Sequence, residues 1–261
     1  MLFVILFLTG IGQAVAQSSE TKPFRVGAGL GCSFFGYREE TEAPINRYAN
    51  ALTYIVDGNI EKSNFLHSLN FNFFYGEAKM AAPYREYSHK HYNVYRGFLE
   101  YALDCRLWGN NIFPGYLGGS FHTIVNFTAV DEELAHIPTG FVLFSINLHA
   151  TQKWIINDKN TLTLSAGFPV FGYAVRPPYA MTSNLWEKYI NEENYLKLIS
   201  LGEVTSIHNY TAFFADIKYQ YSISELVSIY SGFGVELLRI NFYHTRIDAI
   251  CRLNAGVAFT F

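Results

Sequence analysis

The C-terminal segment 246–261 alternates between two kinds of side chain up to its last residue, and this pattern limits the possible folds more than any other feature. One parity is apolar throughout and comprises Ile247, Ala249, Cys251, Leu253, Ala255, Val257, Phe259 and Phe261. The other is mostly polar or small and includes Asp248, Arg252, Asn254, Gly256 and Thr260. Successive side chains of a β-strand point to opposite faces. The pattern is therefore typical of a transmembrane strand between lipid and a hydrated lumen.

About ten segments alternate in this way and predict an all-β fold, an antiparallel up-and-down transmembrane β-barrel. The expected strands span 24–36, 48–59, 64–76, 94–108, 116–128, 140–154, 162–172, 207–222, 226–242 and 246–261. Their length favours a membrane barrel, because strands of soluble sandwiches are usually shorter. The aromatic content of 17% fits the aromatic girdles of such a barrel.

The predicted connections fall into two kinds. Tight turns are expected at 61–64, 157–159 and 224–225, and longer segments at 38–47, 77–93, 129–139 and 174–206. An even number of strands puts both termini at the tight-turn end, which is periplasmic in barrels of this kind. The segment 174–206 is too long for a simple connection. We expect it to hold a short extracellular helix that begins at Thr182 or Ser183 and ends near Gly202, covering the lumen or binding a protein partner.

The N-terminus has the features of a secretory signal. Residues 2–8 form an apolar core that is too short to span a bilayer as a helix, and Ala14, Val15 and Ala16 supply a small-x-small cleavage pattern. The predicted organisation is thus a signal peptide at 1–16 and a barrel at 17–261. No later segment offers about 18 consecutive apolar residues, so no transmembrane helix is expected.

Charge and cysteine content exclude other classes. The net charge is −3 and no basic patch occurs, so we expect no binding to nucleic acid. Cys32, Cys105 and Cys251 are odd in number and widely spaced, which argues against a disulfide scaffold or a zinc site. Cys32 and Cys251 lie on the first and last strands, which barrel closure makes neighbours; whether they form a bridge stays open. No cofactor is expected.

The closing segment resembles that of bacterial outer-membrane β-barrel proteins. In that class, a terminal aromatic residue preceded by apolar residues at every second position is recognised by the barrel-assembly machinery. The matching positions here include Leu253, Val257, Phe259 and Phe261. The resemblance implies a location in the bacterial outer membrane, among its lipid and lipopolysaccharide. The dense use of Tyr and Phe, and Gln17 after the cleavage site, resemble outer-membrane barrels of Bacteroidota.

Charged residues of both signs have inward parity. They are Arg96, Glu100, Asp104, Arg106, Asp216, Lys218, Glu236, Asp248 and Arg252. The interior of a barrel of about ten strands is narrow and largely filled by side chains. Charges there must be paired or hydrated. The set is therefore expected to form a salt-bridged plug, with a selective pathway for a small solute as the alternative.

A second inward group contains two histidines on consecutive strands. If Val130 lies opposite Phe141, the register pairs His122 with His149, Ser120 with Thr151 and Asn126 with Ser145. This would form a polar patch of Ser120, His122, His149 and Thr151 in the lumen wall. Two imidazoles can belong to a metal site, but no third ligand is evident and none is expected. A hydroxyl beside histidine is also used in nucleophilic catalysis.

The predicted function is non-enzymatic: a plugged or narrow barrel whose extracellular loops bind a ligand or partner. The first alternative is a narrow channel for small solutes, and the second is a membrane-embedded lipid or peptide hydrolase. Barrel phospholipases and lipid A deacylases carry His and Ser two positions apart on one strand. Here His67 and Ser68 are adjacent and face opposite sides, and two positions after His122 and His149 stand Ile124 and Thr151. The omptin proteases share the expected strand number but require an Asp-Asp pair and an Asp-His pair near the outer rim, where this sequence offers Asp131, Glu132, Glu133 and His136 in a single short loop without a second cluster.

Overall fold

The computed structural model describes seven stretches of the chain. They are residues 24–39, 43–80, 92–130, 139–176, 195–206, 208–242 and 244–261. The predicted signal peptide at 1–16 and the helix start predicted at Thr182 or Ser183 lie outside these stretches.

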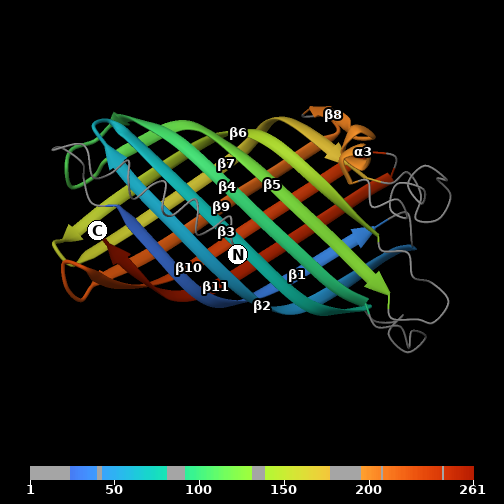
Figure 1. Ribbon diagram of the computed structural model, residues 1–261, viewed down its shortest axis with the longest axis horizontal. Helices are drawn as coiled ribbons and strands as arrows, with labels where there is room; N and C mark the ends of the chain where they lie inside the picture. Colours follow the sequence, from blue (N-terminus) through green and yellow to red (C-terminus); the bar gives the residue numbers. More distant parts are fainter. Residues whose placement is uncertain are drawn as a thin grey trace.

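Ten strands form a closed antiparallel barrel, which confirms the predicted fold (Figure 1). The strands are β1 Arg25–Glu39, β2 Ala43–Lys62, β3 Phe65–Met80, β4 Tyr92–Trp108, β5 Gly115–Val130, β6 Thr139–Asn157, β7 Asn160–Val175, β9 Tyr210–Ser222, β10 Val227–Phe242 and β11 His244–Thr260. Each pairs with its neighbour along the barrel wall, and the short β8, Glu203–Ser206, pairs with the end of β7. The helix α3, Tyr195–Ser200, precedes β8, and its last residues lie close to the predicted end at Gly202.

The barrel closes between its first and last strands. The register runs from Arg25 opposite Thr260 to Glu39 opposite Arg246. Two backbone hydrogen bonds between Phe24 and Phe261, at 3.1 and 2.8 Å, extend this seam to the end of the chain. Closure pairs the strands around the wall, which is the condition for a sheet to cross a bilayer. Toward the loop end, the last part of β7 pairs with β8 instead of β9.

The outer face carries a continuous apolar band. Its exposed members include Leu30, Phe34, Leu52, Phe71, Leu99, Phe121, Leu148, Phe213, Phe233 and Leu253. The charged side chains that share this outward parity stand near strand ends: Arg38, Lys62, Glu77, Lys79 and Arg239. The strands are 13–20 residues long, whereas about 9–11 suffice to cross the hydrocarbon core. The wall therefore extends beyond a lipid-facing band. No helix in the described stretches is long and apolar enough to cross a membrane.

The two ends of the barrel differ. The C-terminus and the connections at 63–64, 109–114, 158–159 and 223–226 lie at one end, called here the short-turn end, on the left of Figure 1. The opposite end carries α3 and β8 and is called the loop end. Near the short-turn end, Trp108 Nε1 donates to Gln152 Oε1 at 2.8 Å. The cysteines are unbridged, and in the register Cys32 lies opposite Leu253 while Cys251 lies opposite Phe34.

Candidate functional site in the lumen

Side chains fill the half of the lumen nearer to the loop end. Two apolar clusters contribute, and each member is exposed by 6% or less. The first contains Phe98, Ile124, Phe141, Leu143, Ala174, Tyr210, Ala212, Phe214, Leu238 and Ile240. The second contains Phe35, Tyr37, Ala49, Ala51, Phe74, Ala78, Tyr92, Val94 and Ile250. We call this region the sealed half.

Arg96 links three strands across the lumen in the sealed half. From β4 it forms ion pairs with Glu236 of β10 and, at 2.9 Å, with Asp248 of β11. Its guanidinium carbon lies 5.8 Å from the ring centroids of Phe35 and of Phe141. Because Arg96 pairs with both carboxylates in this water-poor region, the three side chains depend on one another. These members of the inward charge set lie together as a salt-bridged group.

Two further buried arginines lie in the sealed half and are absent from the predicted charge set. Arg246 is 1% exposed; its Nε donates to Asp248 Oδ1 at 2.9 Å and its Nη2 to Asn126 Oδ1 at 3.1 Å. Arg47 is also fully buried, with its guanidinium carbon 4.6 Å from the centroid of Tyr92. Both have the inward parity of their strands, and this parity is the sequence signal that identifies them.

An aromatic layer separates the sealed half from the rest of the lumen. The His122 ring lies edge-on to Phe214 at 4.6 Å and to Phe98 at 5.0 Å between centroids. Phe98 and Phe214 are themselves 5.9 Å apart. On the other side of this layer, the Arg252 guanidinium carbon lies 6.0 Å from the Phe98 ring. Packed rings of this size leave little room for hydrated ions.

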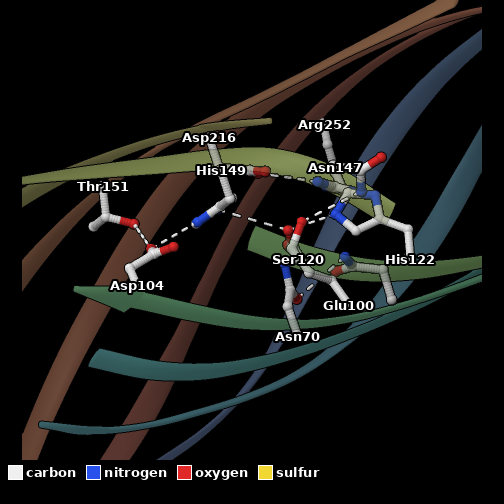
Figure 2. Close-up of polar contacts among 11 residues, drawn as sticks. Asn70, Glu100, Asp104, Ser120, His122, Asn147, His149, Thr151, Asp216 and Arg252 are labelled. Carbon is white, nitrogen blue, oxygen red and sulfur yellow. Dashed lines mark hydrogen bonds and ion pairs between the residues drawn. The ribbon is translucent and has the colours of Figure 1, made fainter. Parts of the chain in front are cut away.

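Below the aromatic layer, a polar network joins the two predicted histidines (Figure 2). His122 Nε2 lies 2.5 Å from Glu100 Oε1, and His149 Nε2 lies 3.7 Å from the same oxygen. His149 Nδ1 bonds Asp104 Oδ2 at 2.7 Å, and the Thr151 hydroxyl donates to that oxygen at 3.0 Å. We call these five residues the histidine–carboxylate network. Glu100 of β4 thus connects the histidines of β5 and β6, and Asp104 of β4 binds His149 and Thr151 of β6.

The predicted register between these two strands is wrong. His122 lies opposite Ser145 and Ser120 opposite Asn147, whereas His149 lies opposite Gly118. The error is a shift of four positions. An even shift keeps every side chain on its own face, so alternation predicts parity correctly without fixing the partner. The histidines meet through Glu100 rather than side by side.

Gly118 makes the contact between Asp104 and His149 possible. It lies between them in the sheet, opposite Asp104 on one side and His149 on the other. A Cβ at this position would overlap the Leu103 carbonyl oxygen and approach Asp104 Oδ1 to 2.8 Å. The neighbouring Gly119 faces outward, where a Cβ would meet only Asn147 O at 3.5 Å. Packing therefore excludes a larger residue at the inward position 118 but not at the outward position 119.

The chemistry available to this network is limited. The Ser120 hydroxyl accepts from Asn147 Nδ2 at 3.3 Å, and the Thr151 hydroxyl bonds Asp104. Neither is positioned to lose its proton to an imidazole, as nucleophilic catalysis requires. Within the described stretches, no group of three His, Cys, Asp or Glu side chains is arranged to hold a metal ion. The arrangement suits mutual charge compensation inside the barrel.

A cavity of about 440 Å³ occupies the lumen on the short-turn side of the aromatic layer. Its deep part reaches Glu100, His149 and Arg252, and its outer part is lined by residues near the strand ends, such as Arg25 and Thr260. We call it the vestibule. The lumen thus combines a sealed half with a partly open, polar half.

Most charges of the vestibule are paired. Arg252 Nη2 lies 3.0 Å from Asp216 Oδ1, and Lys218 Nζ lies 2.5 Å from Asp57 Oδ2. Asp57 shares the inward parity of β2 but is absent from the predicted charge set. Lys153 reaches Glu61 at 3.5 Å. Arg106 bonds the Asn111 side-chain carbonyl at 3.3 and 3.4 Å. The inward charge set is therefore divided between two separate parts of the lumen.

The expected assembly residues lie on the outer face of the seam. Leu253, Val257 and Phe259 are 40–55% exposed, and Phe261 is 74% exposed. All stand on the lipid-facing side of β11 or directly after it.

A closed barrel of ten antiparallel strands, with an apolar outer band and a polar inner face, defines a protein with the fold of bacterial outer-membrane β-barrels. This confirms the resemblance at the level of fold. The chain is similar in structure to the outer-membrane protease OmpT of Escherichia coli, with a TM-score of 0.56, 7% identity, and coverage of 94% of this chain and 99% of that one.

Two further solved structures match with lower scores. The translocator domain of the autotransporter NalP from Neisseria meningitidis has a TM-score of 0.46 and 11% identity, covering 98% of this chain and 96% of that one. Neisserial surface protein A has a TM-score of 0.41 and 8% identity, covering 93% and 100%. The sequence matches no protein-family model, and no curated protein matches it.

Proposed function

We propose that this protein is a closed, non-conducting barrel of the bacterial outer membrane that acts through its loop end. The observation that supports this is the sealed half, where apolar side chains and buried arginines occupy the lumen. A solute that entered the vestibule would meet the aromatic layer of Phe98, His122 and Phe214. Conduction through the lumen would require these side chains to move aside. A barrel that serves as a scaffold for binding loops is instead made more rigid by their packing.

The conductance of planar bilayers tests the sealed lumen. We expect the purified barrel to give no reproducible current steps, and a Phe98→Ala/Phe214→Ala variant to give them, because it removes both rings that flank His122. Leu99→Ala/Phe213→Ala is the matched control, since it removes two large side chains from the outer face of the same strands. The proposal would be overturned if the unaltered protein gave reproducible current steps and the Phe98→Ala/Phe214→Ala variant gave steps of the same size.

We also propose that the short-turn end faces the periplasm. Short connections and both chain ends are gathered at the periplasmic side in barrels of this class. A cysteine at Glu225, in a background with Cys32, Cys105 and Cys251 replaced by Ser, is then expected to resist a membrane-impermeant thiol reagent in intact cells. The same cysteine should react after the outer membrane is permeabilised. Full labelling in intact cells would reverse the orientation.

The location in the outer membrane implies three partners. The outer band would contact outer-membrane lipid and lipopolysaccharide. The barrel-assembly machinery would recognise the apolar row that ends at Phe261, and the segment 174–206 would bind a protein partner.

OmpT is a protease, so cleavage is the enzymatic alternative. Against it, His122 and Asp104 are fully buried, and among the described residues neither the Ser120 nor the Thr151 hydroxyl bonds an imidazole. Peptide or lipid cleavage that disappears in His149→Ala would contradict the non-enzymatic role.

A further inference from the structure

The vestibule carries more positive than negative side chains. Its lining includes five cations, Arg25, Arg106, Lys153, Lys218 and Arg252. It includes four carboxylates, Asp57, Glu61, Glu100 and Asp216. Within the described stretches, Lys153, Lys218 and Arg252 each have a carboxylate partner, whereas Glu100 is engaged by His122. Arg25 interacts electrostatically with Asp57, which is already paired with Lys218, and no carboxylate of the described stretches forms an ion pair with Arg106. Positive charge is therefore in excess at these two arginines.

Arg25 differs from Arg106 in the hydrogen bonding of its guanidinium group. Its Nε and Nη2 are buried without a partner in the described part of the chain, whereas Arg106 is held by Asn111. A buried guanidinium N–H that makes no hydrogen bond loses its hydration without compensation. An oxyanion is the natural partner, because two of its oxygens match two parallel N–H groups of arginine.

Tyr230 supplies a further donor beside Arg25. It is 4% exposed and lines the vestibule. Its buried hydroxyl lies toward Asp57, but it forms no hydrogen bond of ordinary geometry within the described stretches. Lys218 Nζ lies 4.0 Å from the centre of its ring, and the Arg25 guanidinium carbon lies 5.9 Å from it. One phenol and two cations therefore gather at one wall, with Asp57 as the carboxylate that pairs with Lys218.

Glycines keep space open at this wall. A Cβ at Gly29 or at Gly256 would come within 2.6 Å of the Tyr230 hydroxyl oxygen. Tyr230 can therefore lie flat against β1 and β11, and larger residues there would push its ring into the vestibule. Deeper in the cavity, Arg252 is 6% exposed, and its Nε is buried without a partner while its Nη2 bonds Asp216 (Figure 2). The unpartnered donors thus continue along the cavity.

From these observations we propose that the vestibule is a binding site for a small solute that carries one carboxylate or phosphate group, centred on Arg25, Lys218 and Tyr230. A volume of about 440 Å³ lies within the range of small-molecule sites. The anionic group bonds Arg25 and Tyr230, and the rest of the solute extends toward the polar deep wall. The site is separate from the loop end, so it gives the barrel a second binding function on the opposite side of the membrane.

Binding of inorganic phosphate and of acetate to the refolded full-length barrel in detergent tests this site. Phosphorus NMR line widths report the first probe, and saturation transfer to the methyl protons reports the second. We expect saturable binding of at least one probe. Arg25→Gln should weaken it about tenfold or more, the loss expected from one charge-assisted hydrogen bond. Arg38→Gln is the matched control, because this arginine lies on the same strand but faces outward, and it should change affinity less than about twofold.

Folding of each variant is checked by the heat-dependent gel shift of the barrel. Should Arg25→Gln fail to fold, Tyr230→Phe retains the ring and removes only the hydroxyl, and it is expected to weaken binding several-fold. Absence of saturable binding of both probes would overturn the site, as would equal affinity in the Arg25 or Tyr230 variant and the unaltered protein. Neither result affects the conductance measurement, so the vestibule site and the sealed lumen are tested independently.

Discussion

Arg96→Met is expected to lower the free energy of unfolding of the barrel by about 3–5 kcal/mol, because it removes the cation paired with buried Glu236 and one of the two cations paired with buried Asp248. Methionine retains most of the length and apolar volume of the side chain, so the loss comes from charge rather than from a cavity. Denaturant-dependent folding into lipid vesicles, followed by tryptophan fluorescence, measures the change.

Two further variants isolate the cause. Arg239→Met removes an arginine from the outer face of β10, where its one bond within the described stretches is to the Asn241 side chain, and should cost less than about 1 kcal/mol. Adding Glu236→Gln to Arg96→Met should restore part of the lost stability, because it removes one uncompensated charge. If Arg96→Met unfolds like the unaltered protein, the sealed half does not depend on this ion-pair group.

Phe71→Arg is expected to destabilise the membrane-inserted barrel by about 2–4 kcal/mol, the cost of an arginine near the middle of the lipid-facing band. Phe71 is 41% exposed on the outer face, where it lies between Val56 of β2 and Leu99 of β4. The measurement is the same vesicle unfolding experiment. It tests the membrane location of this face independently of any structural similarity.

The depth of the residue provides the control. Asn50 is also outward and exposed, but it stands toward the loop end, opposite Glu77. Asn50→Arg should therefore cost less than about 1 kcal/mol, since an arginine there can reach water and a carboxylate. Equal costs at the two positions would mean that the outer face of β3 does not lie in the hydrocarbon.

The sequence pattern predicts the fold of this chain well because a strand in a membrane barrel has two faces with opposite solvents. Residues such as Leu253 and Arg252 cannot exchange faces without placing a charge in lipid. Alternation therefore identifies the strands and the inward side chains. It also predicts where tight turns occur, since polar residues at 61–64 and 157–159 interrupt it close to the observed connections.

Contacts across the lumen are much harder to predict. Arg96 meets Glu236 and Asp248 although their strands are not neighbours in the wall. These contacts depend on how far each strand is shifted along the barrel, and a shift by an even number of residues leaves alternation unchanged. The same ambiguity explains the wrong partner predicted for His122. The division into a sealed half and a vestibule depends on these shifts.

The seam between β1 and β11 has a consequence for how the molecule forms. Arg25 and Thr260 are paired although nearly the entire described chain lies between them. Bringing together such distant residues carries the largest loop-closure entropy of any strand pair in the barrel. The seam is thus the natural last step of folding, and until it forms the sheet presents two open edges whose backbone groups invite pairing with another chain. A catalyst of assembly would have to occupy those edges and release them together.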